Sequence, residues 1–365
     1  MEDATYVVKV PGKLMIAGEY AVTEPNQASI VVAVDRYITA KIVTSKVNQL
    51  TLPQLGLDHV TWDIKSGIVN FPSEDKRLRF IQNAFHVVYQ YLHERDISIK
   101  PFHLAVTSEL DDPSGKKYGL GSSAAIVVAV VTTMLKLHDS HKGKVNPDII
   151  FKLAAIAHFK TQGNGSCADI AASTYGGWLH YTAFSADWLV EQIHKVTSIS
   201  TLVESQWPML QVDSITPPTE LHFCVGWTGE SAATAPMVSH VQQFCNENPE
   251  AYQNFLTESS RAVNKIATGF LQNDSDMVMR GMRDNRFILL KIAELAHVTI
   301  ETPELKRLAN IAEQYGSGKS SGAGGGDCGI AFVKKESQAE KLKLEWEKVA
   351  IHSLNLKASL QGAYK

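Results

Sequence analysis

A glycine-rich stretch near the C-terminus, GSGKSSGAGGGDCGI at residues 316–330, contains seven of the 24 glycines in the chain. Glycine loops of this kind can bind phosphate, because their backbone N–H groups converge on an anion. The P-loop spacing fails, however, since its first glycine would fall on Glu313. A helical pattern at 302–315 precedes the stretch and a strand pattern at 328–333 follows it. We therefore expect a helix, then a glycine loop, then a strand. The loop could bind phosphate by a geometry other than that of a P-loop, or it could simply be flexible, and these residues alone do not decide between the two.

A second glycine cluster, KKYGLGSSAAIVVAVVTTMLKL at residues 116–137, leads into a long apolar segment. Its β-branched residues allow a strand, but its length and its Ala-Ala start favour a buried helix. Unpaired N–H groups and the positive dipole end make such a helix N-terminus a good phosphate site. Ser122 or Ser123 could then ligate a Mg²⁺ ion that bridges two phosphates, or could simply cap the helix. Capping accounts for one serine but not for the Gly-Leu-Gly before it or the two preceding lysines. These residues therefore favour phosphate binding.

Two further segments carry polar residues beside glycines. The first, VVKVPGKLMIAGEYAV at residues 7–22, predicts a strand, a Pro-Gly turn carrying Lys13 and a second strand closed by Gly-Glu-Tyr. An isolated lysine after a turn is usually solvated, so this segment alone is weak evidence. The second, QGNGSCADIAASTYGG at residues 162–177, predicts a capping box between Ser166 and Asp169. The ionised Asp169 could instead orient or deprotonate a hydroxyl beside a phosphate.

Composition sets broad limits on the function. The chain has 365 residues, 44% of them hydrophobic and 20% charged, which is typical of one large or two medium globular domains. A net charge of −3 gives no support for nucleic-acid binding. The longest apolar run is too short to span a bilayer, and no signal peptide is visible. The four cysteines are far apart, which argues against zinc and a disulfide framework and favours a cytoplasmic protein.

The order of the predicted elements points to an α+β fold. A candidate linker surrounds Pro217 and Pro218. After it we expect a strand at 222–228, three or four helices, the glycine loop, the strand at 328–333, a helix at 337–350 and a final strand at 353–360. Strands and helices mix without the regular alternation of a parallel α/β protein.

Three of these segments, in their order along the chain, resemble the GHMP kinase superfamily. They are PGKLMIAGEYAV near the start, GLGSSAA about a third of the way along, and KSSGAGGGDCGIAF near the end. Within the superfamily, GKKYGLGSS, NGSCADIA, VGWTGESAAT and KSSGAGGGDCGIA are similar to the bacterial phosphomevalonate kinase branch. Mevalonate kinases and galactokinases usually carry Gly-Glu-His where this chain has Gly18-Glu19-Tyr20, which makes a mevalonate kinase the less favoured branch.

The resemblance implies a two-lobed α+β fold with the active site between the lobes. The N-terminal lobe, residues 1–205, would be ribosomal-protein-S5-like with a left-handed βαβ crossing. The C-terminal lobe, residues 206–365, would be ferredoxin-like. The GLGSS loop would hold most of the nucleotide phosphates, whereas the loop at 316–330 would close over the site and contact the substrate and the terminal phosphate.

The resemblance also implies roles for individual residues. Lys13 would neutralise charge between the two phosphates, Asp169 would contact the substrate, and Ser123 would ligate Mg²⁺. The expected ATP-binding residues are Lys116, Gly119, Leu120, Gly121, Ser122, Ser123 and Ala124. The expected substrate-binding residues are Lys13, Gly18, Glu19, Tyr20, Ser166, Asp169, Ser321, Gly322 and Ala323. Candidates for holding the acceptor phosphate are Lys13, Arg36 and Lys319.

The implied reaction converts (R)-5-phosphomevalonate to (R)-5-diphosphomevalonate with ATP and Mg²⁺, in the mevalonate pathway of isoprenoid biosynthesis. The enzyme would act as a monomer or homodimer. A phosphate acceptor is largely ionised near pH 7, because its second pKa is about 6, so a general base is not obligatory. A mevalonate or other small-alcohol kinase, with Asp169 as a true base, is the alternative. A non-catalytic nucleotide or sugar sensor is a third, although it would not need Lys13, Ser123 and Asp169 together.

Overall fold

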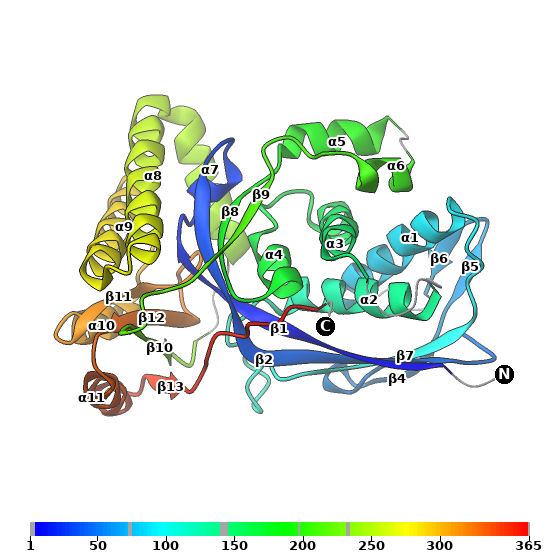
Figure 1. Cartoon of the computed structure of the whole chain (residues 1–365), viewed down its shortest axis with the longest axis horizontal. Coiled ribbons are helices and arrows are strands. Elements are labelled where there is room, and N and C mark those ends of the chain that lie inside the picture. The colour runs from blue at the N-terminus through cyan, green and yellow to red at the C-terminus, as the bar shows by residue number, and fades with distance from the viewer. Residues whose placement is uncertain (1–3, 72–74, 139–144, 196–197, 231–233, 364–365) are drawn as a thin grey trace.

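A computed structural model describes residues 4–71, 75–138, 145–195, 198–230 and 234–363 of the chain. It has two lobes, each built on its own antiparallel or largely antiparallel sheet (Figure 1). This arrangement confirms the two-lobed α+β class. The first lobe holds the N-terminal strands and the helices α1 to α6, and the second holds the long hairpin of α8 and α9 (Figure 1).

The sheet of the first lobe has seven strands in the order β4-β3-β7-β2-β8-β9, with β1 also paired to β2. Its strands are β1 (Thr5–Ala17), β2 (Ala28–Thr44), β3 (Gln49–Leu52), β4 (Leu57–Thr61), β7 (Phe102–Ser108), β8 (Trp178–Thr182) and β9 (Gln211–Ile215). A small hairpin of β5 (Asp63–Lys65) and β6 (Ile68–Asn70) lies beside it.

The predicted Pro-Gly turn before Lys13 is wrong. Residues 5–17 form one continuous strand, β1, which pairs with β2 throughout. Between Pro11 and Gly12 the pairing register shifts, and the residues left unpaired, Asp35 and Arg36, belong to β2. Long apolar pairing with β2 therefore overrides the local turn signal, and the irregularity lies on the partner strand.

Four helices cover one side of this sheet (Figure 1). They are α1 (Arg79–His93), α2 (Ser122–His138), α3 (Pro147–Gln162) and α4 (Ala168–Tyr175). The apolar segment at 124–135 is buried on nearly all sides in α2, as a helix with no polar face must be. The prediction of a buried helix here is confirmed. The shorter elements of this lobe are α5 (Ala186–His194), α6 (Ile199–Glu204) and the 3₁₀ turns η1 (Ala21–Thr23), η2 (Pro53–Leu55) and η3 (Lys76–Leu78).

The second lobe follows the ferredoxin-like order. Its four strands are arranged β11-β12-β10-β13, which is the spatial order 2-3-1-4 of a split βαβ unit. The strands are β10 (His222–Trp227), β11 (Gly316–Ser320), β12 (Cys328–Val333) and β13 (His352–Leu354). The helices are α7 (Thr234–Glu247), α8 (Pro249–Leu271), α9 (Ser275–Leu295), α10 (Pro303–Ala312) and α11 (Glu336–Glu347). The expected strand at 222–228, the helices after it and the helix at 337–350 are confirmed, with small shifts at their ends.

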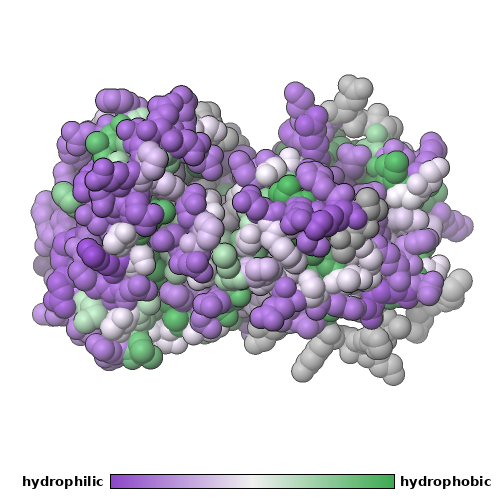
Figure 2. Space-filling model, turned by 90° about the horizontal axis from the view of Figure 1, so that it is seen from above, coloured by the Kyte–Doolittle hydropathy of each residue, from purple (hydrophilic) through white to green (hydrophobic). Residues whose placement is uncertain are grey.

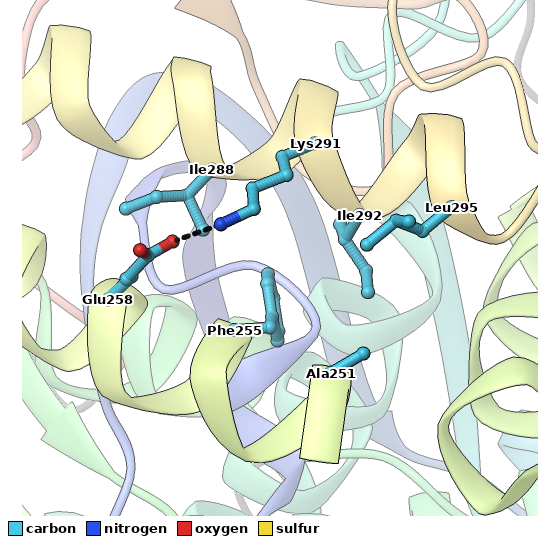
Figure 3. A pocket seen from close by; sticks show the side chains of 7 residues that line it. All are labelled: Ala251, Phe255, Glu258, Ile288, Lys291, Ile292 and Leu295. Carbon is cyan, nitrogen blue, oxygen red and sulfur yellow. Dashed lines mark hydrogen bonds and ion pairs between the residues drawn. The ribbon is translucent and has the colours of Figure 1, made fainter. Parts of the chain in front are cut away.

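Helices α8 and α9 pack as an antiparallel hairpin. Gly281 lets them approach closely, since a Cβ at this position would lie 2.5 Å from the Ile266 side chain. Further along the hairpin, Phe255 and Ile288 line a small pocket beside an ion pair of 3.4 Å between Glu258 and Lys291 (Figure 3). The pocket there has a volume of only about 10 Å³, room for no more than one water molecule.

The chain passes between the lobes twice. It leaves the first sheet after β9 and enters the second at β10, through the connection at 216–221 that contains Pro217 and Pro218. Strand β9 still pairs with β8 of the first lobe. We therefore propose that the boundary between the lobes lies at 216–221 rather than after residue 205.

The end of the chain returns to the first lobe. The strand expected at 353–360 is shorter than predicted: β13 ends at Leu354, and Ala358 makes an isolated bridge to Val34. The Ser359 N–H then donates to the Ala33 carbonyl at 2.9 Å. Ala363 is fully buried, and its N–H donates to the Ser173 carbonyl on α4. Hydrogen bonding to the first lobe thus replaces sheet pairing in the second. Within the described residues, no helix has the length and apolarity needed to cross a bilayer.

Candidate active site between the lobes

A cavity of about 680 Å³ lies where the two lobes meet. In the space-filling view the lobes stand side by side with a furrow between them (Figure 2). Leu110 and four segments from the first lobe line the cavity: 13–23, 117–123, 158–162 and 164–169. The second lobe contributes one face of α7, Tyr252 of α8 and residues of the loop at 321–327. All of the predicted glycine segments therefore reach a single cavity, although they are spread over more than 300 residues of sequence.

The N-terminus of α2 points into this cavity. The helix begins at Ser122, and the Gly121 carbonyl accepts the hydrogen bond of 3.1 Å from the Ala125 N–H that opens its first turn. Gly121 therefore stands where a cap residue would be, and both serines lie inside the first turn. Both line the cavity beside N–H groups that no helix carbonyl can satisfy. Neither Ser122 nor Ser123 is therefore the N-cap residue of α2.

Lys13 lies against the same loop. Its N–H donates to the Leu120 carbonyl at 2.8 Å, so the backbone of β1 is fixed to the loop before α2. Its side chain crosses the face of Gly121, where a Cβ would approach Lys13 Cγ to 3.0 Å. Gly121 has a φ of 78°, which strongly favours glycine. The side chain of Lys13 is thereby held beside the N-terminal end of α2, in the lining of the cavity.

The predicted capping box between Ser166 and Asp169 is wrong. The N-cap of α4 is Cys167, which adopts a left-handed φ of 57° and makes no side-chain cap. Ser166 Oγ accepts a long hydrogen bond of 3.4 Å from the Ala168 N–H, and Asp169 Oδ1 accepts from the Ile170 N–H at 2.9 Å. The left-handed residue breaks the reciprocal geometry that a capping box needs. Ser166 and Asp169 both line the cavity instead.

The glycine stretch at 316–330 is mostly not a loop. Residues 316–320 form strand β11 against β12, so the expected order of helix, loop and strand gains a strand. Gly318 is required by packing, because a Cβ there would lie 2.4 Å from Ala312 Cβ on α10. The true loop is 321–327, between β11 and β12. Ser321, Gly322, Ala323 and Gly324 of this loop line the cavity.

Lys319, the lysine of the Gly-Lys-Ser sequence, points into the protein. It is fully buried, and its ammonium lies 2.5 Å from Glu19 Oε1 and 2.6 Å from the Ser320 carbonyl. Glu19 is only 1% exposed. The candidate role of Lys319 as a ligand of the acceptor phosphate is therefore replaced by an internal ion pair between the lobes.

The segment after β1 makes a strained turn. Tyr20 has φ 62° and ψ −48°, and the Ala21 N–H donates to the Glu19 carbonyl at 2.7 Å. This is the positive-φ form of the γ-turn, which is rare because it is strained. For a bulky residue such a conformation costs on the order of 1–3 kcal/mol and persists only where surrounding contacts impose it. One such contact is the Tyr20 hydroxyl, which donates to the Ala323 carbonyl at 2.6 Å.

The loops of the two lobes also meet beside α2. Gly119 gives Asp327 room, since a Cβ at 119 would lie 2.5 Å from Asp327 Cβ. Cys328 Sγ donates to the Tyr118 carbonyl at 3.1 Å, and burial raises the pKa of this thiol. Lys116 donates to the Gly229 carbonyl at 2.9 Å and lies outside the cavity. Its neighbour Lys117 lines the cavity instead.

Most residues predicted for the site lie in the cavity, and some do not. Those that line it are Lys13, Glu19, Tyr20, Gly119, Leu120, Gly121, Ser122, Ser123, Ser166, Asp169, Ser321, Gly322 and Ala323. Those that lie outside its lining are Gly18, Arg36, Lys116, Ala124 and Lys319. Ala124 is fully buried in α2, and Gly18 shapes the turn after β1, where a Cβ would lie 2.5 Å from the Ala28 carbonyl oxygen.

The structure adds residues that sequence reasoning missed. They are Met15, Lys117, His158, Gln162, Asn164, Ser239, Gln242, Tyr252 and Asp327. His158 and Gln162 are four residues apart on α3, a spacing that places both on one face. Val238, Val241 and Cys245 show the same periodicity on α7. Helical spacing could have grouped each set, but no local signal indicates that these faces border the cavity.

Ser123 suits a magnesium ion that arrives with a nucleotide. In the described part of the chain, no group of three or more His, Cys, Asp and Glu residues could hold a metal by itself. Magnesium on a nucleotide needs few protein ligands, because the phosphates and water supply most of its coordination. The hydroxyl of Ser123, in the first turn of α2, offers one such oxygen.

A two-lobed fold with a cavity between the lobes is the architecture expected for a small-molecule kinase of this kind. Comparison with known proteins assigns the chain to a family. The model of the GHMP kinase N-terminal domain matches residues 79–177, and the model of the GHMP kinase C-terminal region matches residues 266–352. A curated phosphomevalonate kinase from Streptomyces sp. (strain CL190) is 32% identical and is covered over 98% of both chains. The chain therefore belongs to the GHMP kinase family, which confirms the resemblance seen in its motifs.

Solved structures agree with this assignment. A protein from Listeria innocua superposes with a TM-score of 0.93 at 39% identity, over 98% of each chain. Streptococcus pneumoniae phosphomevalonate kinase, in complex with phosphomevalonate and AMPPNP, superposes with a TM-score of 0.84 at 28% identity, over 97% of this chain and 99% of that one. Full-length similarity of this kind covers both lobes and every segment that lines the cavity.

Proposed function

We propose that the chain phosphorylates (R)-5-phosphomevalonate with ATP to give (R)-5-diphosphomevalonate. The observation that carries the proposal is the meeting of Lys13, the α2 N-terminus and Asp169 in one cavity between the lobes. A full-length relative from Streptomyces is a phosphomevalonate kinase, and a similar structure holds phosphomevalonate and an ATP analogue. The reaction would serve the mevalonate pathway of isoprenoid biosynthesis.

The nucleotide phosphates would lie on the first turn of α2. Backbone N–H groups there are free to bind anions, and the helix dipole adds positive potential. Gly119, Gly121 and Ser122 would let the phosphates approach the backbone closely. Mg²⁺, held by the phosphates and Ser123, would neutralise charge on the transferred group. Lys117, which lines the cavity, would add a further cation near the nucleotide.

Lys13 would stabilise the transfer itself. Two anionic phosphates must approach one another, so the barrier is largely electrostatic, and a fixed cation lowers it. The contact with Gly121 and the backbone hydrogen bond to Leu120 hold Lys13 next to the phosphate site. Asp169, at the start of α4, would orient the mevalonyl part through its hydroxyl. No proton must leave a phosphate acceptor, so Asp169 would position rather than deprotonate.

A mevalonate kinase is the second candidate. A curated mevalonate kinase from Thermococcus onnurineus is 25% identical and is covered over 92% of this chain and 90% of its own. With an alcohol acceptor, Asp169 would have to accept or orient the proton of the attacking hydroxyl. The two candidates therefore give Asp169 different roles: it positions the substrate in a phosphomevalonate kinase and accepts or orients the hydroxyl proton in a mevalonate kinase.

An ADP-release assay with phosphomevalonate and mevalonate side by side tests the proposal. We expect turnover to require phosphomevalonate, ATP and Mg²⁺, with phosphate detected on the acceptor by ³¹P NMR. A kcat/KM for mevalonate equal to or above that for phosphomevalonate would favour the second candidate. Tight nucleotide binding without turnover would favour a sensor. The expected cytoplasmic location and the monomeric or dimeric state stay predictions, which fractionation and light scattering would check.

A further inference from the structure

Three residues that alternate along the end of β11 and the following loop contact the end of β1 and the segment after it. Lys319 pairs with Glu19, with 2.5 Å between the ammonium and the carboxylate oxygen. Ser321 Oγ donates to the Met15 carbonyl at 2.9 Å and accepts from the Met15 N–H at 3.1 Å. The Ala323 carbonyl accepts from the Tyr20 hydroxyl at 2.6 Å. Each contact joins the second lobe to the first across the cavity.

The γ-turn at Tyr20 makes two of these contacts possible. Successive residues in extended or helical backbone would not both direct their side chains at the same part of the other lobe. The positive φ of Tyr20 turns the chain so that Glu19 reaches Lys319 while Tyr20 reaches Ala323. A strained conformation at a cavity wall, held by two long-range contacts, is typical of a functional constraint.

The chemistry of the contacts suits a permanent fastening. Burial, and the neighbouring carboxylate of Glu19, raise the pKa of the Tyr20 hydroxyl, which therefore stays a donor at neutral pH. Lys319 has its charge neutralised by Glu19 and is shielded from water, so it is not free to bind a phosphate. Ser321 uses its hydroxyl as both donor and acceptor on β1.

We propose that Glu19, Tyr20 and Lys319 are positioning residues, an interlobe clasp that fixes the loop at 321–324 over the cavity before any ligand binds. Glu19 and Tyr20 were expected to bind substrate directly. In the clasp they act through the loop, whose Gly322 and Ala323 backbone borders the cavity. The clasp also gives a reason for tyrosine after Gly-Glu, because its hydroxyl spans the distance to the Ala323 carbonyl. A loop ordered in advance costs less entropy when the acceptor binds.

Hydrogen–deuterium exchange on the unliganded protein tests the clasp without any assumption about substrate. Tyr20→Phe removes one hydroxyl and keeps the ring. We expect exchange in peptides covering 321–327, where the Ser321 and Gly325 N–H groups are hydrogen-bonded, to accelerate roughly fivefold, the effect of one lost hydrogen bond. Tyr37→Phe is the matched control, because the Tyr37 hydroxyl contacts Ser359 Oγ at 3.3 Å, away from the cavity lining. It should leave the loop unchanged.

Kinetics separate positioning from direct binding, and this arm rests on the proposed function. For Tyr20→Phe we expect the KM for phosphomevalonate to rise roughly fivefold with kcat nearly unchanged, since the loss falls on binding. Faster exchange and a raised KM together support the clasp. Unchanged loop exchange in Tyr20→Phe overturns it, whether or not activity changes. If the wild type fails to phosphorylate phosphomevalonate, the proposed function falls, but the exchange result still decides on the clasp.

Discussion

The side chain of Lys13 lies on the bare backbone of Gly121, with Cγ 3.0 Å and Cε 3.1 Å from the point where a Cβ would stand. A residue of β1 and the residue that opens α2 thus share one surface. The contact joins the proposed catalytic cation to the proposed phosphate site. The contact is this close because residue 121 has no side chain, and a Cβ there would force the lysine side chain to shift.

Gly121→Ala should therefore displace Lys13. Alanine at a φ of 78° costs about 1 kcal/mol or more, and its methyl group would push the lysine side chain aside. We expect kcat to fall, but by less than the roughly 100-fold that misplacing a catalytic group by about 1 Å can cost, because distances of 3.0 and 3.1 Å require Lys13 to shift by less than that. Gly115→Ala is the matched control, since Gly115 has a φ of 86° and no atom within 4 Å of the position that the new methyl group would take. Equal kinetic losses in the two variants would contradict the contact.

Lys13 and Asp169 should differ in what their loss does. Lys13→Met should lower kcat by roughly 10²-fold or more, because a preorganised cation acts on the transition state. Asp169→Asn should chiefly raise the KM for phosphomevalonate and lower kcat less. Steady-state kinetics of both variants check this, with Lys9→Met on the same strand as control. An inactive Asp169→Asn that still binds both substrates, beside an active Lys13→Met, would point to an alcohol acceptor.

Ser123→Ala should cut kcat strongly while changing stability little. Gly121 already provides the cap of α2, so the free energy of unfolding should change by less than about 1 kcal/mol, the usual value of a lost cap. Ser185→Ala is the contrasting control, because Ser185 Oγ does cap α5 by accepting from the Trp188 N–H at 3.3 Å. It should lower stability by about 1 kcal/mol with full activity. Urea unfolding and turnover measured on the same samples compare the two.

Lys319→Met should destabilise the protein on the order of 3–5 kcal/mol, because it strands the buried carboxylate of Glu19. The double variant Glu19→Gln with Lys319→Met removes both charges and should recover most of that loss. ATP affinity of the double variant, measured by calorimetry without acceptor, should stay near that of the wild type. A large loss of ATP binding would mean that the loop at 321–327, and not the α2 N-terminus, cradles the nucleotide.

Stability should decline as the pH falls below about 6.5. Burial lowers the pKa of His138 from its ordinary value of 6.5, so the unfolded chain takes up a proton at a pH where the folded protein does not. Protonation then favours unfolding below this pH and has no effect well above it. The same direction holds for His86, His103 and His180. Between about pH 7.5 and 5.5, Tm of His138→Gln should fall less than Tm of the wild type, and a parallel decline would exclude His138 as a contributor.

Local patterns in the sequence determined the elements that depend on near neighbours. The apolar run after Ser123 had to be buried, because it has no polar face to leave in water, and its length favoured a helix over a strand. The glycine pair around Leu120 and the two serines predict an anion site at the start of that helix. The failed P-loop spacing showed that Lys319 does not belong to a P-loop, and the order of motifs led to the family.

Only the tertiary structure decided what those residues touch. Pairing with the 17-residue strand β2 kept the Pro-Gly sequence before Lys13 within a strand, where a turn was predicted. A left-handed Cys167 replaced the expected capping box, and β12 drew residues 316–320 into a strand that buries Lys319 against Glu19. Each of these outcomes depends on a partner distant in sequence, in the case of Lys319 by 300 residues. Hydrogen bonding and burial between such partners leave no pattern in the local sequence. The motifs could therefore identify the family, but they could not predict which residues contact one another.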